Sequence, residues 1–105
     1  MKLIVSVVEG QDVSHVITAL TRQHIRVTHM SSTAGLLDPG KSTLLIGVED
    51  VLVPQIMRMV ADLAGPHETV VPYSYHEEPS LSGFRGVVVG GYTSFVLNVA
   101  HFEQV

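Results

Sequence analysis

The chain has 105 residues, a formal net charge of −4 and no cysteine. This length suits a single domain over residues 1–105, the charge disfavours nucleic-acid binding through phosphates, and the lack of cysteine excludes disulfides and thiolate chemistry. No apolar run approaches the ~20 residues that span a membrane and no signal sequence is evident, so we expect a cytoplasmic protein without membrane insertion.

The first third of the sequence predicts a strand, a helix and a second strand. Leu3–Val8 (LIVSVV) is a β-branched run typical of a strand. Asp12 is a candidate N-cap for a helix over Val13–His24, in which apolar residues recur at helical spacing. Arg26–Ser32 predicts the second strand, and Ala34–Lys41, with two glycines and a proline, predicts the loop that follows.

The middle of the chain predicts a third strand and a second helix. Thr43–Val48 (TLLIGV) is largely apolar and suits a strand. Asp50 is a candidate N-cap for a helix that reaches Ala64 with one apolar face, and Gly65-Pro66 is a strong stop signal. The residues that follow, Glu68–Tyr75, look extended.

The last third combines a polar loop with two apolar segments. Tyr75–Gly86 contains proline and glycine and predicts a long mobile loop. Val87–Val89 and Tyr92–Val99 flank Gly90-Gly91, which indicates a hairpin or a bulge. The resulting order, β-α-β-β-α-β with an extra strand near the end, predicts an α+β sandwich of the ferredoxin-like class.

The apolar pattern of the strands also predicts an oligomer. In a ferredoxin-like fold the helices cover only one face of the sheet, so the strands should alternate apolar and polar residues. LIVSVV, TLLIGV and FVLNV instead place apolar side chains on both faces. Because a large exposed apolar face is rare on soluble monomers, we expect identical subunits to cover it.

Three stretches carry a resemblance to a known family. They are MKLIVSVVEGQD at the start, RVTHMSSTAGLLDPGKSTLLIGVED in the middle, and VVVGGYTSFVLNVAHFEQV at the end. In this order and spacing the chain resembles the PII-like cyclic-di-AMP receptors of the PII superfamily, over nearly its whole length. The Tyr75–Gly86 loop, which looks shorter here, interrupts the likeness.

The resemblance implies a PII-like homotrimer that binds one cyclic-di-AMP in each cleft between adjacent subunits and signals to an unknown downstream protein. It implies no enzymatic activity, cofactor or metal. Carried onto this sequence, the residues at or near the ligand are His24, Arg26, Thr28, Gly35, Leu36, Leu37, Lys41, Gly47, Phe95 and Gln104.

Several of these positions depart from the family pattern. His24 and Lys41 stand where asparagine is common, and Leu36 stands in place of a ligand-stacking phenylalanine. Ala34 replaces a loop glycine, and Asp38 replaces a frequent arginine. These departures leave open an alternative, a trimer of the same superfamily that senses another adenine nucleotide or a metal.

Each of these residues also has a simpler interpretation. Arg26 could be a solvated residue at a strand end, Gly47 could mark a bulge, and Phe95 could belong to the core. His76-Glu77-Glu78 lacks metal-site spacing and suits a solvated loop. The sequence carries no nucleophile–base motif, so catalysis has no support.

Overall fold

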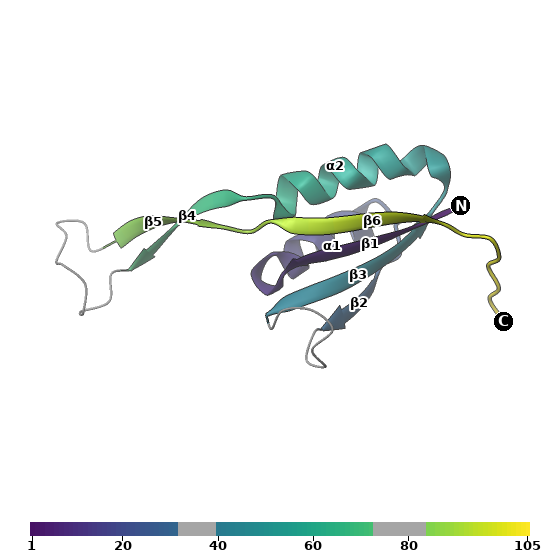
Figure 1. Cartoon of the computed structure of the whole chain (residues 1–105), viewed down its shortest axis with the longest axis horizontal. Helices are drawn as coiled ribbons and strands as arrows, with labels where there is room; N and C mark the ends of the chain where they lie inside the picture. The colour runs from purple at the N-terminus through teal and green to yellow at the C-terminus, as the bar shows by residue number, and fades with distance from the viewer. Residues whose placement is uncertain (32–39, 73–83) are drawn as a thin grey trace.

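The computed structural model describes residues 1–31, 40–72 and 84–105. Four antiparallel strands form one sheet in the order β2-β3-β1-β6, and helices α1 and α2 pack on one of its faces (Figure 1). The elements of this layer are β1 (Lys2–Glu9), α1 (Val13–Arg22), β2 (Thr28–Ser31), β3 (Lys41–Val48), α2 (Val53–Ala64) and β6 (Tyr92–Asn98). This arrangement confirms the predicted α+β, ferredoxin-like fold.

Two further strands, β4 (His67–Pro72) and β5 (Phe84–Val89), pair with each other and extend away from the main sheet (Figure 1). The predicted loop over Tyr75–Gly86 is therefore wrong at its end, because residues 84–86 belong to β5. The remainder of that prediction, residues 75–83, lies outside the described residues.

Gly90 and Gly91 do not form a hairpin between β5 and β6, because these strands belong to different sheets. Both glycines have positive φ, 89° and 108°, which other residues rarely adopt. The Gly91 amide donates to the carbonyl of Ala64 at 2.7 Å, so this junction also caps the end of α2. The glycine pair thus fastens the β4–β5 hairpin to the helical layer.

The core lies between the helices and one face of the sheet. Ile4 and Val8 of β1 are fully buried there, and they pack with apolar residues of β3 and both helices. Ser6 lies between them and is fully buried as well. Its hydroxyl lies 2.7 Å from that of Ser94 on β6, so neither polar group is left without a partner.

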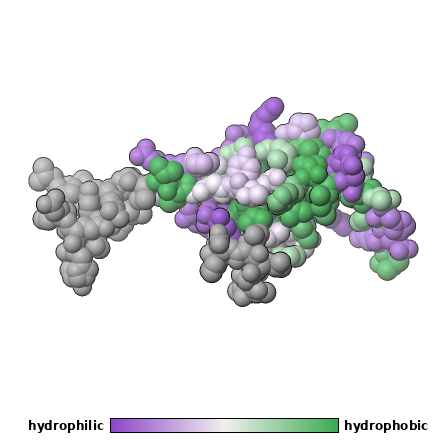
Figure 2. Space-filling model, viewed as in Figure 1, coloured by the Kyte–Doolittle hydropathy of each residue, from purple (hydrophilic) through white to green (hydrophobic). Residues whose placement is uncertain are grey.

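The opposite face of the sheet is also apolar. By strand alternation it carries Leu3, Val5 and Val7 of β1, and Val5 pairs with Phe95 on β6. Phe95 is 55 % exposed and Leu97, on the same face, is 49 % exposed. Figure 2 shows the hydrophobic surface that gathers along β6. The predicted apolar residues on both faces are therefore present.

Asp12 occupies the predicted N-cap position of α1, whereas the prediction for Asp50 is wrong, because the N-cap of α2 is Leu52. Each lies in a short 3-10 turn, Gly10–Asp12 or Asp50–Leu52, and neither carboxylate makes a capping hydrogen bond. Helix α1 also ends at Arg22, two residues earlier than predicted. A 3-10 turn precedes each α-helix. The last residue with an extended backbone therefore lies before that turn, further upstream than the sequence pattern indicates.

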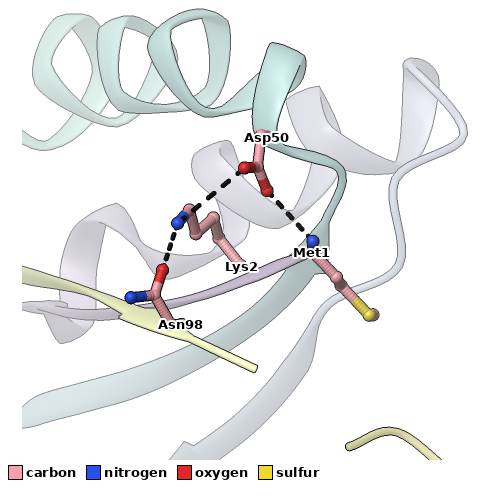
Figure 3. A network of polar contacts seen from close by, with 4 residues as sticks. All are labelled: Met1, Lys2, Asp50 and Asn98. Carbon is pink, nitrogen blue, oxygen red and sulfur yellow. Dashed lines mark hydrogen bonds and ion pairs between the residues drawn. The ribbon is translucent and has the colours of Figure 1, made fainter. Parts of the chain in front are cut away.

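Asp50 instead joins a polar network at the start of β1 (Figure 3). Its carboxylate lies 3.0 Å from the amino group of Met1 and 3.8 Å from Lys2 Nζ, and Lys2 donates in turn to Asn98 Oδ1. The hydrogen bond from the Met1 amino group, helped by the Lys2 charge, lowers the pKa of Asp50 below its usual 3.8. The network connects the ends of β1 and β6 with the approach to α2.

Replacing Asp50 by asparagine should lower the free energy of unfolding slightly at neutral pH. A lowered carboxyl pKa contributes stability above the usual pKa, and that contribution is lost as the pH falls through the folded-state value. Urea denaturation should show a difference between wild type and Asp50→Asn at neutral pH that shrinks below pH ~4. The neighbouring Glu49→Gln is the control, and an equal loss of stability in that variant would contradict the assignment.

Candidate functional site

A groove opens at the end of the sheet where β1 begins and β3 ends. Its volume is about 330 Å³, near the lower limit for ligand pockets. The wall combines a cationic side chain, a carboxylate, a histidine and an exposed glycine with apolar residues. The lining residues are Met1, His24, Ile25, Arg26, Gly47, Val48, Glu49 and Leu52.

A second groove of about 670 Å³ lies against the same segment, with α1 as its other wall. His24, Arg26 and Thr28 all line it. The segment is held by Ile25, which is buried and whose amide donates to the Leu20 carbonyl at 3.0 Å. His24 has φ of 60°, which turns the chain out of the helix. Ile25 thus anchors the segment, while His24 and Arg26 remain exposed.

Gly47 leaves space on the apolar face of the sheet. It pairs with Leu3 and is exposed although it lies inside β3. A Cβ at this position would lie 3.3 Å from the Cε atom of Met1, the flexible end of a side chain. The fold therefore does not require glycine here for backbone conformation, and close approach of a ligand becomes a better reason for it.

The other predicted site residues lie elsewhere in the subunit. Lys41 is at the opposite end of β3 from Gly47, six residues or ~20 Å away, where its Nζ lies 3.9 Å from Glu9. Gln104 lies in the exposed tail after β6, which leaves the sheet at the end where the groove opens (Figure 1). Residues 35–37 lie outside the described part of the chain.

Thr28 and Phe95 share a row that crosses the whole sheet. Thr28 pairs with Leu45, Leu45 with Val5, and Val5 with Phe95. Strand spacing of ~4.8 Å places the two ends of this row ~14 Å apart, on opposite edges of the sheet. One subunit thus brings together His24, Arg26, Thr28 and Gly47, and it places Phe95 at the far edge.

The sequence analysis did not identify five further wall residues, which are Met1, Ile25, Val48, Glu49 and Leu52. Glu49 follows Gly47 by two residues and continues the extended backbone beyond β3, so strand alternation could have placed it in the groove. Met1 lines the groove through its ion pair with Asp50, which local sequence does not indicate.

Comparison with known proteins identifies the family. The model of the cyclic-di-AMP receptor family matches residues 1–105, the full length given. The chain belongs to the cyclic-di-AMP receptor family. The structure is also similar to the crystal structure of a functionally unknown protein from Pediococcus pentosaceus. That match has a TM-score of 0.82 and 30 % identity, and it covers 99 % of this chain and 96 % of the other.

Family membership supports cyclic-di-AMP as the nucleotide partner and a binding role rather than a catalytic one. Within the described ranges, no three or more metal-binding side chains gather in one place, and no helix has the length and hydrophobicity to cross a membrane. His76-Glu77-Glu78 falls outside those ranges.

Gly47→Ala should weaken binding of cyclic-di-AMP by roughly tenfold, about 1.4 kcal/mol, while the fold remains intact. The added methyl group would occupy the groove, whereas the Met1 side chain can shift to admit it. Calorimetric titration measures the affinity, and thermal unfolding is the control. Unchanged affinity would mean that no ligand approaches Gly47.

Proposed function

We propose that this protein is a cytoplasmic signalling receptor whose single domain assembles as a homotrimer. Cyclic-di-AMP binds in clefts between adjacent subunits, and the occupied trimer is recognised by a downstream protein. The family match supports the ligand class. The placement of Thr28 and Phe95 on opposite edges of one sheet supports a cleft formed by two subunits.

This proposal rests on the placement of Thr28 and Phe95 at opposite edges of the sheet. A ligand in contact with both residues of one subunit would have to lie flat across Val5 and Leu45. Those residues belong to the apolar face, which favours covering by protein over contact with an anionic ligand. When a neighbouring subunit supplies Phe95, its ring reaches a base held at the Arg26 groove of the first subunit.

Each described residue has a chemical role in this cleft. The Arg26 guanidinium forms charge-assisted hydrogen bonds with a phosphate, and the Thr28 hydroxyl adds a neutral one. Gly47 admits the ligand close to the backbone, and Phe95 stacks on an adenine. His24, which lines both grooves, is a further hydrogen-bonding group. Gln104 closes the site from the tail.

The second candidate is a trimer of the same superfamily that senses another adenine nucleotide. Leu36, in place of the stacking phenylalanine, and Lys41, paired with Glu9 far from Gly47, favour it. Calorimetric titration against cyclic-di-AMP, cyclic-di-GMP and ATP distinguishes the candidates. Tightest binding of cyclic-di-AMP supports the first candidate, and tightest binding of ATP supports the second.

The protein should behave as a trimer of three times the 11.4 kDa chain mass in light scattering. Leu97→Asp should dissociate it and abolish ligand binding, because a charge would then lie on the buried apolar face. Val88→Asp is the matched control, since Val88 is 71 % exposed on β5, outside the main sheet. A monomer at micromolar concentration would refute both the trimer and the shared cleft.

Arg26→Ala should weaken cyclic-di-AMP binding by roughly 10- to 150-fold, because a hydrogen bond to a charged group is worth ~1.5–3 kcal/mol. The fold should persist, since the Arg26 side chain is exposed. Arg58→Ala, at an exposed position on α2, removes the same charge outside the groove and should bind normally. If Arg26→Ala and Arg58→Ala bind cyclic-di-AMP equally tightly, the phosphates do not bind at Arg26.

Leu36→Phe is the complementary change and should tighten binding of cyclic-di-AMP. An added aromatic ring can stack on an adenine, which is worth ~1–3 kcal/mol per base. The same titration measures this gain. If neither wild type nor Leu36→Phe binds an adenine dinucleotide, the receptor proposal fails although the fold assignment stands.

A further inference from the structure

Two adjacent carboxylates, Glu49 and Asp50, have opposite surroundings. Asp50 has two cationic neighbours, the Met1 amino group and Lys2. Glu49 has no hydrogen-bond or ion-pair partner for its carboxylate among residues 1–31, 40–72 and 84–105. Asp50 therefore serves the fold, whereas the carboxylate of Glu49 remains available.

Glu49 is directed toward the same groove as Arg26. Its backbone is extended, with φ of −69° and ψ of 152°, and it directly follows the last residue of β3. Extended residues two positions apart project to the same side, so Glu49 points to the side on which Gly47 leaves space. Arg26, Gly47 and Glu49 all line this groove.

A free carboxylate in a groove for a phosphate-bearing ligand needs a physical reason. An ionised carboxylate only accepts hydrogen bonds and repels phosphate, so by itself it weakens binding of the anionic part of the ligand. It becomes favourable when it meets a hydrogen-bond donor of the ligand, because such a charge-assisted bond is among the stronger ones. Adenine presents such a donor in its 6-amino group.

We propose that Glu49 accepts a hydrogen bond from the 6-amino group of the bound adenine and so selects the base, while Arg26 binds a phosphate. This inference rests on the proposed function, because it takes an adenine dinucleotide as the ligand. It adds a specificity-determining residue to the cleft. The groove then holds a cation that binds the phosphate and an anion that binds the amino group of the base.

The test compares cyclic-di-AMP with the cyclic dinucleotide of purine riboside, which lacks the 6-amino group. Wild type should prefer cyclic-di-AMP by roughly tenfold or more in calorimetric titration. Glu49→Ala should bind the two ligands nearly equally, and Glu49→Gln, which keeps an acceptor oxygen without the charge, should retain part of the preference. Glu68→Ala, at an exposed position on β4, makes the same charge change elsewhere and should keep the wild-type preference.

The possible outcomes separate this inference from the proposed function. If Glu49→Ala retains the wild-type preference, or if Glu49→Gln binds cyclic-di-AMP more tightly than wild type, Glu49 only repels the phosphates and the inference is wrong. In that case Arg26→Ala still tests the cleft. If wild type binds no adenine dinucleotide, the proposed function and this inference fail together. Thermal unfolding verifies that each variant is folded.

Discussion

Strand β1 is hydrogen-bonded along its length to β3 on one side and to β6 on the other, and this double pairing fixes the positions of all other functional elements. It sets Gly47 opposite Leu3 and Phe95 opposite Val5. Because strand register determines which face a side chain occupies, a shift of one residue would bury Phe95 against the helices and withdraw it from the open face. The site therefore depends on register more than on any single contact.

The Met1, Lys2, Asp50 and Asn98 network holds the end of this pairing where the groove opens (Figure 3). Exposed ion pairs contribute little to stability individually, so the value of this network lies in the geometry that it sets. By holding Asp50 and Met1, it positions the chain between β3 and α2, on which Glu49 lies. The network includes the Asp50 carboxylate, whereas the Glu49 carboxylate has no partner within the described part of the chain.

The sequence predicts those features that short-range patterns control. Apolar periodicity predicts both helices, a β-branched run predicts β1 and an apolar run predicts β3, because a local residue pattern indicates each of these elements. Residues 84–86 are predicted as loop because local sequence does not indicate their pairing with β4, whose partner residues lie 12 to 16 positions earlier. The resemblance supplied Arg26 and Gly47, which the fold brings into one groove. Strand alternation from Gly47 could have placed Glu49 in the groove, but the cation partners that Asp50 has in the fold are not evident from the sequence.

A cleft shared between subunits couples ligand binding to assembly. A ligand that needs Arg26 of one subunit and Phe95 of the next binds only the assembled form, so it stabilises that form by RT ln(1 + [L]/Kd) per site. At a concentration one hundred times Kd this amounts to ~2.7 kcal/mol for each occupied cleft. Arg26, next to the buried Ile25, and Glu49, directly after β3, suit this coupling because the fold positions both before a ligand arrives.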